Sequence, residues 1–121
     1  MLFDLVSELD ADVNAAGAQL IVVVVPSFTQ VYPELWARFT ETHPLPAGKS
    51  WNRESPGRRI ADFCSGRGLQ VIDLLPGLER AARREPYLYY HWNGHWTPEG
   101  NRYVASIVLQ ELGPVAEGTA R

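Results

Sequence analysis

Apolar side chains recur at two different spacings along the chain, and the change from one to the other predicts where helices and strands lie. Residues 2–13 carry apolar side chains at helical spacing, and Gly17 follows where such a helix would end. Residues 20–25 are instead continuously apolar and mostly β-branched, and Pro26 ends the run. This is typical of a parallel strand covered on both faces. We therefore expect an amphipathic helix with one buried stripe, followed by a central strand.

The same order of helix and strand then recurs. Further helices are expected over residues 30–39, 58–67, 76–84 and 97–112, and a second buried strand over residues 69–75. Pro33 fits the first turn of its helix. Alternating helices and buried strands indicate an α/β fold with parallel strands flanked by helices. We expect one domain over residues 1–112 and a flexible tail over residues 113–121.

A long loop is expected over residues 42–56, which contain several prolines and show no sustained hydrophobic period. Loops of this length often serve as lids or binding loops, and a tolerated insertion is the alternative. Trp51 within it is either an anchor for the loop or a contact for a substrate.

Composition and charge narrow the range of partners. A chain of 121 residues with a formal net charge of −3 lacks the cationic field that holds a nucleic acid, so no nucleic-acid partner is expected. The longest apolar run is too short to cross a membrane, and the N-terminus is acidic, unlike a signal peptide. These features predict a soluble chain that is not exported and is cytoplasmic by default.

The single cysteine, Cys64, predicts no internal disulfide and a place in the core.

The main candidate for chemistry is His95. Thr97 is a typical N-cap and Pro98 a typical first helical residue, so a well-marked helix begins two residues after the histidine. A histidine fixed in this way suits general base catalysis near neutral pH. By geometry alone, a histidine that only hydrogen-bonds its loop is the commoner case.

The segment Gly94-His-Trp-Thr-Pro-Glu-Gly-Asn101 resembles the closing catalytic segment of SGNH (GDSL-type) hydrolases, which reads Asp-x-His-Trp before a Pro-x-Gly helix start. The Val-rich run that ends at Pro26-Ser27 and the run Val71–Leu75 are also similar to that family. The resemblance implies a flavodoxin-like three-layer fold, of which this chain would be the C-terminal half. It further implies that His95 is the histidine of a Ser-His-Asp triad, without a cofactor. The implied activity is hydrolysis of acyl or acetyl esters of small molecules or glycans, with polysaccharide O-acetyl transfer as a near variant.

Two departures from the family pattern bear on this activity. Asn93 stands where the family has its acid, and the corresponding change in a serine protease lowers turnover roughly ten-thousandfold. Weak activity is therefore expected unless another carboxylate, such as Glu99, substitutes. The family's Gly-Asp-Ser motif is absent from the sequence. Ser27, at the carboxyl end of a strand, is expected to line the substrate site and not to be the nucleophile.

Aromatic residues cluster around the histidine. Tyr90, Trp92 and Trp96, together with Tyr87 and Tyr89, form either a platform for a sugar or acyl group or part of the core. His91 lies four residues before His95, but both are in a loop without a nearby third ligand, so no metal site is expected.

Two hypotheses therefore remain from the sequence. The first is an SGNH-type esterase, incomplete alone, acting on a small-molecule or glycan ester. The second is a non-catalytic remnant that binds a carbohydrate or a partner through its aromatic residues. Two strands also make too small a sheet, with unpaired edges, so we expect either a longer parent protein, a homo-oligomer or a complementing chain.

Overall fold

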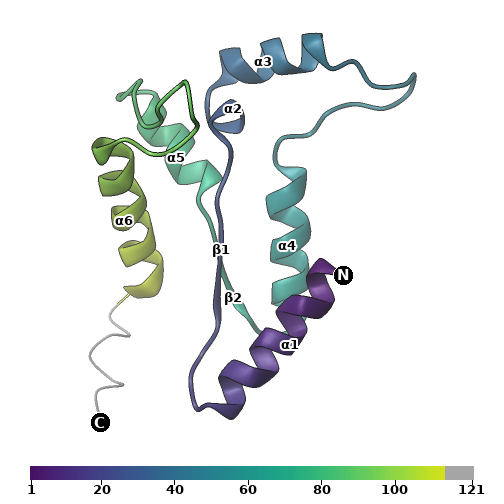
Figure 1. Ribbon diagram of the computed structural model, residues 1–121, viewed down its shortest axis with the longest axis vertical. Coiled ribbons are helices and arrows are strands. Elements are labelled where there is room, and N and C mark those ends of the chain that lie inside the picture. Colours follow the sequence, from purple (N-terminus) through teal and green to yellow (C-terminus); the bar gives the residue numbers. More distant parts are fainter. Residues whose placement is uncertain (114–121) are drawn as a thin grey trace.

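The computed structural model describes residues 1–113 and has the predicted α/β architecture (Figure 1). The elements in chain order are α1 (Leu2–Ala15), β1 (Ile21–Val24), α2 (Phe28–Val31), α3 (Pro33–Thr42), α4 (Ser55–Ser65), β2 (Gln70–Asp73), α5 (Leu75–Ala82) and α6 (Pro98–Leu112). Helices α1 and α4 lie on one side of the strands, and α5 and α6 lie on the other. The structure thus has three layers. The predicted tail falls mainly on residues 114–121, which lie outside the described residues.

The two strands pair in parallel, as predicted, and within residues 1–113 they are the whole of the sheet. Val23 lies opposite Ile72 in the register. Ile72 is 2% exposed, whereas Val23 is 41% exposed. The prediction of a central strand covered on both faces was therefore wrong for β1. Its second edge has no neighbouring strand among these residues, and the helices cover mainly β2.

Helix α1 forms where the helical spacing predicts it, and Gly17 follows with a φ of +76°. Its expected buried stripe is not found, because Leu2, Leu5 and Leu9 are all half or more exposed. The helix is attached instead through Phe3, whose ring stacks on Phe63 of α4 at 4.4 Å between centroids. The helix is thus only partly covered, and these three leucines remain at least half exposed within the described residues.

Three other boundaries differ from the sequence prediction. The helix expected over residues 30–39 is two helices, because Tyr32 takes an extended conformation and Pro33 starts α3. Helix α4 begins at Ser55, inside the predicted loop. The strand expected over residues 69–75 ends at Asp73, whose carboxylate accepts the backbone N–H of Leu75 at 3.0 Å and so starts α5.

The core lies between β2 and the layer formed by α5 and α6. Its buried residues come from α2, β2, α5 and the segment before α6: Val31, Tyr32, Ile72, Leu74, Leu75, Leu78, Ala81, Leu88 and Tyr89. Cys64 is also buried, as predicted, and burial raises the pKa of its thiol. Within residues 1–113, no helix combines the length and the apolar composition needed to cross a bilayer.

The unequal burial of the two register partners predicts unequal effects of truncation. Ile72→Ala should lower the free energy of unfolding by about 2–5 kcal/mol, because it leaves a cavity in the core. Val23→Ala should lower it by about 1 kcal/mol or less, since Val23 is already 41% exposed and its truncation leaves no closed cavity. Urea denaturation of both variants measures this difference, and equal losses would show that β1 is covered on this face in solution.

Candidate functional site

His95 lies in the loop between α5 and α6, at the end of a tight turn. The backbone N–H of Tyr90 donates to the carbonyl of His95 at 2.8 Å, and the N–H of Gly94 donates back to the carbonyl of Tyr90 at 2.9 Å. Gly94 has a φ of +71°, which the turn requires and which a residue with a Cβ rarely adopts. The turn thus fixes the backbone on both sides of the histidine.

The start of α6 holds this turn against the core. Thr97 is the N-cap, as predicted: its hydroxyl accepts the N–H of Gly100 at 3.1 Å and donates to the carbonyl of Tyr87 at 2.6 Å. The backbone N–H of Thr97 donates to the carbonyl of Leu88 at 3.0 Å. Helix α6 and the segment before the turn are therefore joined directly around His95.

Two buried tyrosines connect the same segment to the end of β1. The hydroxyl of Tyr89 donates to the carbonyl of Pro26 at 2.9 Å, and the hydroxyl of Tyr32 accepts the N–H of Leu88 at 3.0 Å. Burial is the main cause that raises the pKa of both tyrosines above the ordinary value. The histidine loop and the carboxyl end of β1 consequently form one rigid region.

Asn93 supports the turn and not the imidazole. Its side-chain oxygen accepts the backbone N–H of His95 at 3.0 Å. Within residues 1–113, no hydrogen bond involves the His95 imidazole, which is exposed. Glu99, the other carboxylate considered, pairs with Arg102 on its own helix at 3.0 Å. The described residues thus hold the backbone of His95 but supply no acid that orients its ring.

The aromatic cluster divides into members that belong to the core and members that are exposed. Tyr89 is buried, and Trp96 is half-buried against it with ring centroids 6.4 Å apart, so both belong to the core. Trp92 and Tyr87 are instead exposed, at 79% and 65%. The ring of Tyr90 lies 4.9 Å from that of Trp92. Only the exposed members are placed to meet a ligand.

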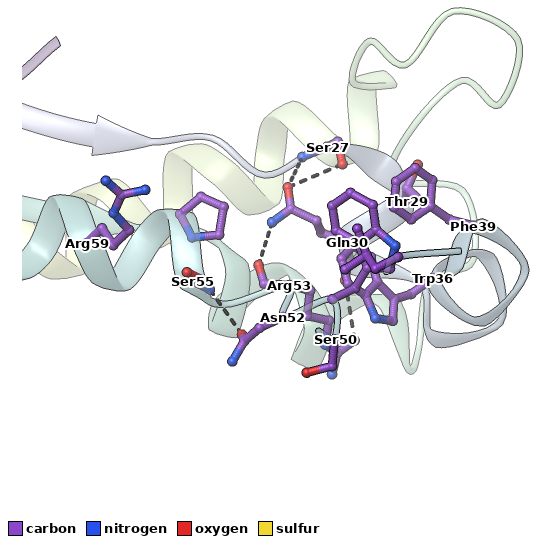
Figure 2. A pocket seen from close by; sticks show the side chains of 13 residues that line it. Ser27, Thr29, Gln30, Trp36, Phe39, Ser50, Asn52, Arg53, Ser55 and Arg59 are labelled. Carbon is purple, nitrogen blue, oxygen red and sulfur yellow. Dashed lines mark hydrogen bonds between the residues drawn. The ribbon is translucent and has the colours of Figure 1, made fainter. Parts of the chain in front are cut away.

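Ser27 lies at one end of a cavity of 550 Å³, a volume typical of small-molecule sites (Figure 2). Its wall combines aromatic and polar side chains from α2, α3, the loop of residues 43–54 and the start of α4, among them Thr29, Gln30, Trp36, Phe39, Trp51, Asn52, Arg53 and Arg59. Gly94 lies beside Phe28, the residue after Ser27. A Cβ built on Gly94 would lie 3.5 Å from the Phe28 ring. The cavity and the histidine loop thus flank the same short segment after β1.

Trp51 is both an anchor and part of the cavity wall. Its indole N–H donates to the carbonyl of His43 at 2.6 Å, and its ring lies 5.2 Å from that of Phe39. The long loop is therefore held in place by its own aromatic residue.

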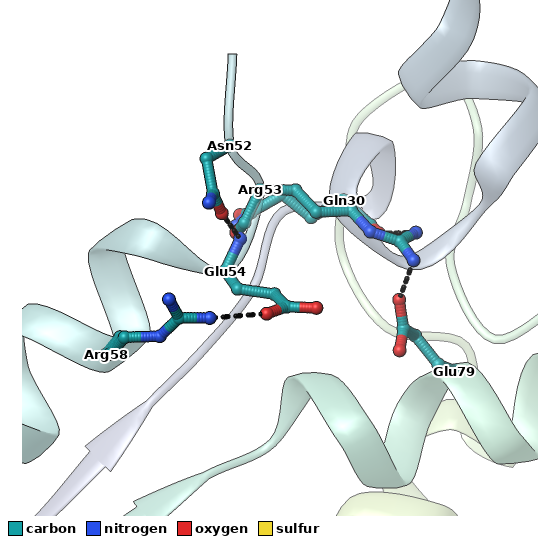
Figure 3. Close-up of polar contacts among 6 residues, drawn as sticks. All are labelled: Gln30, Asn52, Arg53, Glu54, Arg58 and Glu79. Carbon is teal, nitrogen blue, oxygen red and sulfur yellow. Dashed lines mark hydrogen bonds and ion pairs between the residues drawn. The ribbon is translucent and has the colours of Figure 1, made fainter. Parts of the chain in front are cut away.

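Gln30 and Arg53 were not identified from the sequence as site residues, yet they join the walls of the cavity. The Gln30 side chain donates to the carbonyl of Arg53 at 2.6 Å, and the Arg53 guanidinium donates back to the carbonyl of Gln30 at 3.3 Å. Arg53 also lies 2.8 Å from the carboxylate of Glu79 on α5 (Figure 3). Within residues 1–113 this Glu79 oxygen accepts no hydrogen bond, so its contact with Arg53 is an ion pair and not a hydrogen bond. A capping box between Ser27 and Gln30 was the only sequence signal for this arrangement.

Residues 1–113 contain no group of three or more histidine, cysteine or acidic side chains that could hold a metal ion.

Gly100 should be intolerant of any side chain. A Cβ there would overlap the carbonyl oxygen of Leu88 and would lie only 3.2 Å from Cβ of Trp96. Because backbone cannot move aside cheaply, Gly100→Ala should lower the free energy of unfolding by about 1–3 kcal/mol. Thermal or urea denaturation measures this, with Ser106→Ala on the exposed face of the same helix as control. Equal stability of the two variants would contradict the close approach.

The two buried tyrosines predict a loss of stability at alkaline pH. Their folded-state pKa values lie above the ordinary value of about 10, so the unfolded chain releases these protons first as the pH rises. Stability is therefore fully present below pH 10 and declines above it, by up to about 1.4 kcal/mol per pH unit for each tyrosine. Urea denaturation between pH 8 and about pH 11 should show a shallower decline for Tyr89→Phe than for the parent. Identical slopes would contradict the role of Tyr89.

Comparison with known protein families supports the family resemblance of this region. A sequence model of the family described as "SGNH hydrolase-like domain, acetyltransferase AlgX" matches residues 3–120. No curated protein and no solved structure gives a significant match. The match extends over nearly the whole chain and confirms the SGNH resemblance first carried by residues 94–101. The chain therefore belongs to the family of SGNH hydrolase-like domains that includes the acetyltransferase AlgX.

Proposed function

We propose that this chain provides the histidine of an acyl-transfer site that moves an acetyl or other small acyl group from an ester to a hydroxyl. The observation that carries the proposal is the rigid placement of His95 just ahead of a capped helix in a chain of an acetyltransferase family. Ester hydrolysis is the same reaction with water as the acceptor. His95 is the general base in both.

The chemistry requires two proton transfers at one imidazole. In the first half-reaction, His95 removes the proton of a serine hydroxyl while the serine oxygen attacks the ester carbonyl. The ester C–O bond then breaks, the imidazolium returns the proton to the departing alcohol, and the acyl group stays on the serine. In the second half-reaction, His95 takes a proton from the acceptor hydroxyl, whose oxygen attacks the acyl-serine. Breaking that bond returns the proton to the serine and releases the new ester.

Ser27 is a wall residue in this proposal and not the nucleophile. Its hydroxyl donates to the side-chain oxygen of Gln30 at 3.2 Å, within the capping box that starts α2. The printed sequence contains no Gly-Asp-Ser motif. The nucleophilic serine is thus proposed to come from a polypeptide segment other than the described residues.

We propose an acylated small molecule or glycan as the substrate. The exposed ring of Trp92 and the half-buried ring of Tyr90 beside it offer faces on which a sugar ring or acyl chain can stack. The cavity beside Ser27 adds aromatic walls together with amide and hydroxyl groups. Trp96 contributes by packing under the loop, since it is half-buried against the core.

The role of His95 predicts a clear difference between two histidines of the same loop. In this chain without the proposed serine, His95 can still act as general base for water. The slow release of p-nitrophenol from p-nitrophenyl acetate should therefore fall to background in His95→Ala, whereas His91→Ala, which is also exposed, should retain the parent rate. Asn93→Asp should raise the rate at least about tenfold, since a carboxylate can stabilise the imidazolium and the amide cannot. Equal rates for both alanine variants would contradict a general base at His95.

Mass spectrometry after a fluorophosphonate probe extends this test to the nucleophile. A stoichiometric adduct that depends on His95 would assign the serine to this chain, against the proposal.

A non-catalytic binding role is the second candidate, favoured by the 79% exposure of Trp92. In that case Trp92→Ala should abolish the quenching of intrinsic fluorescence by an acetylated oligosaccharide, while His95→Ala should leave it intact and no variant should turn over an ester.

A further inference from the structure

A second hollow lies between α5 and α6, which share one side of the strands (Figure 1). Its volume is 430 Å³, and it shares no lining residue with the cavity beside Ser27. The two helices meet closely at one end of it, since a Cβ built on Gly77 would lie 2.6 Å from Cδ1 of Ile107. This contact fixes the helices against each other, so the hollow is part of the packed fold.

Three arginines line the hollow at the carboxyl end of α5. Arg80 lies in the last turn of the helix, and Arg83 and Arg84 follow directly. All three are exposed, and within residues 1–113 none of them forms a salt bridge. Residues three and four positions apart on a helix are neighbours, so the three charges repel one another. A chain with a formal net charge of −3 therefore gathers positive charge at this place.

The wall of the hollow supplies no opposite charge. It contains no aspartate or glutamate among the residues that the structure describes. Glu79 on α5 pairs instead with Arg53 at 2.8 Å, and Glu99 on α6 pairs with Arg102 at 3.0 Å. Glu85, just after the arginines, accepts the backbone N–H two residues later at 3.1 Å. The arginine charges thus remain available to a ligand.

Helix α6 adds uncharged hydrogen-bonding groups to the same hollow. Tyr103, Ser106 and Gln110 line it with a phenol, an alcohol and an amide. Positive charge at the carboxyl end of a helix stabilises the helix dipole, which gives the arginines of α5 a structural role. That role does not account for donor groups of a second helix around the same hollow. Guanidinium and hydroxyl donors from two elements together form the set that an anion requires.

The charge and size of the hollow favour a phosphomonoester over a carboxylate. A phosphomonoester carries a charge of about −1.5 to −2 near neutral pH and three acceptor oxygens, so one group can meet several guanidinium groups. A carboxylate has a single charge and two oxygens. A volume of 430 Å³ is within the range of small-molecule sites and leaves room for an organic group. The ring of Tyr103 and the side chain of Ile107 give that group an apolar wall.

We propose that the hollow between α5 and α6 binds a small organic phosphomonoester. Arg80, Arg83 and Arg84 bind its phosphate oxygens, and the side chains of α6 contact its organic group. This inference concerns binding at a second site and does not depend on the reaction proposed for His95.

Phenyl phosphate is a suitable probe, because it joins a phosphomonoester to a flat apolar ring. Isothermal titration calorimetry of the full chain should show one saturable site, whose affinity falls as salt screens the attraction. Benzoate and phenyl sulfate carry the same ring with a single charge and should each bind at least about tenfold more weakly. Equal binding of the three anions would overturn the proposal. So would binding to vesicles that contain phosphatidic acid without binding of phenyl phosphate, which would indicate a lipid headgroup.

Matched variants locate the site on the chain. Arg80→Gln and Arg84→Gln should each weaken binding of phenyl phosphate at least about tenfold, through the loss of charge-assisted hydrogen bonds. Arg58→Gln removes the same charge from α4, on the other side of the strands, and should bind like the parent. Ser106→Phe keeps the charge but fills the hollow, so it should also weaken binding.

All four substituted side chains are exposed, so circular dichroism should show unchanged folding. An effect of Arg58→Gln equal to that of Arg84→Gln would indicate non-specific attraction between charges. Parent-like binding by Ser106→Phe would place the anion outside the hollow. Either result would overturn the proposal.

Discussion

The backbone of Leu88 is the point on which the rest of the site depends. Its N–H donates to the hydroxyl of Tyr32, its carbonyl accepts the N–H of Thr97, and its side chain is completely buried. Leu88 therefore joins the core, the start of α6 and the segment after β1 at one residue. Because a buried backbone group without a hydrogen-bond partner costs free energy, breaking any one of these contacts destabilises the fold. The position of His95 is a consequence of this pairing.

The same pairing explains the sequence pattern around the histidine. Gly100 is required because α6 passes against the carbonyl of Leu88 without room for a Cβ, and Gly94 because the turn has a positive φ. The hydroxyl of Thr97 accepts the N–H of Gly100 in the helix and donates to the carbonyl of Tyr87. The segment that identifies the family is thus also a structural unit, and its residues have physical reasons to occur together.

The sequence predicted the fold where local signals are strong. The N-cap at Thr97, the parallel pair of strands and the long loop all followed from helix caps, β-branched runs and prolines. The prediction failed for the surroundings of β1. A continuous apolar run predicts a buried strand, but it does not indicate which segment buries it. The prediction also missed the reciprocal contact of Gln30 with Arg53, since their side chains bond to backbone groups 23 residues apart and leave no local pattern. The exposed leucines of α1 were misjudged for the same reason as β1.

Asn93 separates the needs of the fold from those of the chemistry. Its side-chain oxygen accepts the N–H of His95, and an aspartate carboxylate would accept that hydrogen bond equally well. The turn therefore gives no structural reason for asparagine over the acid that the family resemblance leads one to expect. The amide also makes no hydrogen bond to the imidazole in the described part of the chain, so replacing it by a carboxylate breaks no interaction of the ring. What the asparagine changes is the charge available to an imidazolium, and its presence consequently bears on the proposed acyl transfer and not on the stability of the loop.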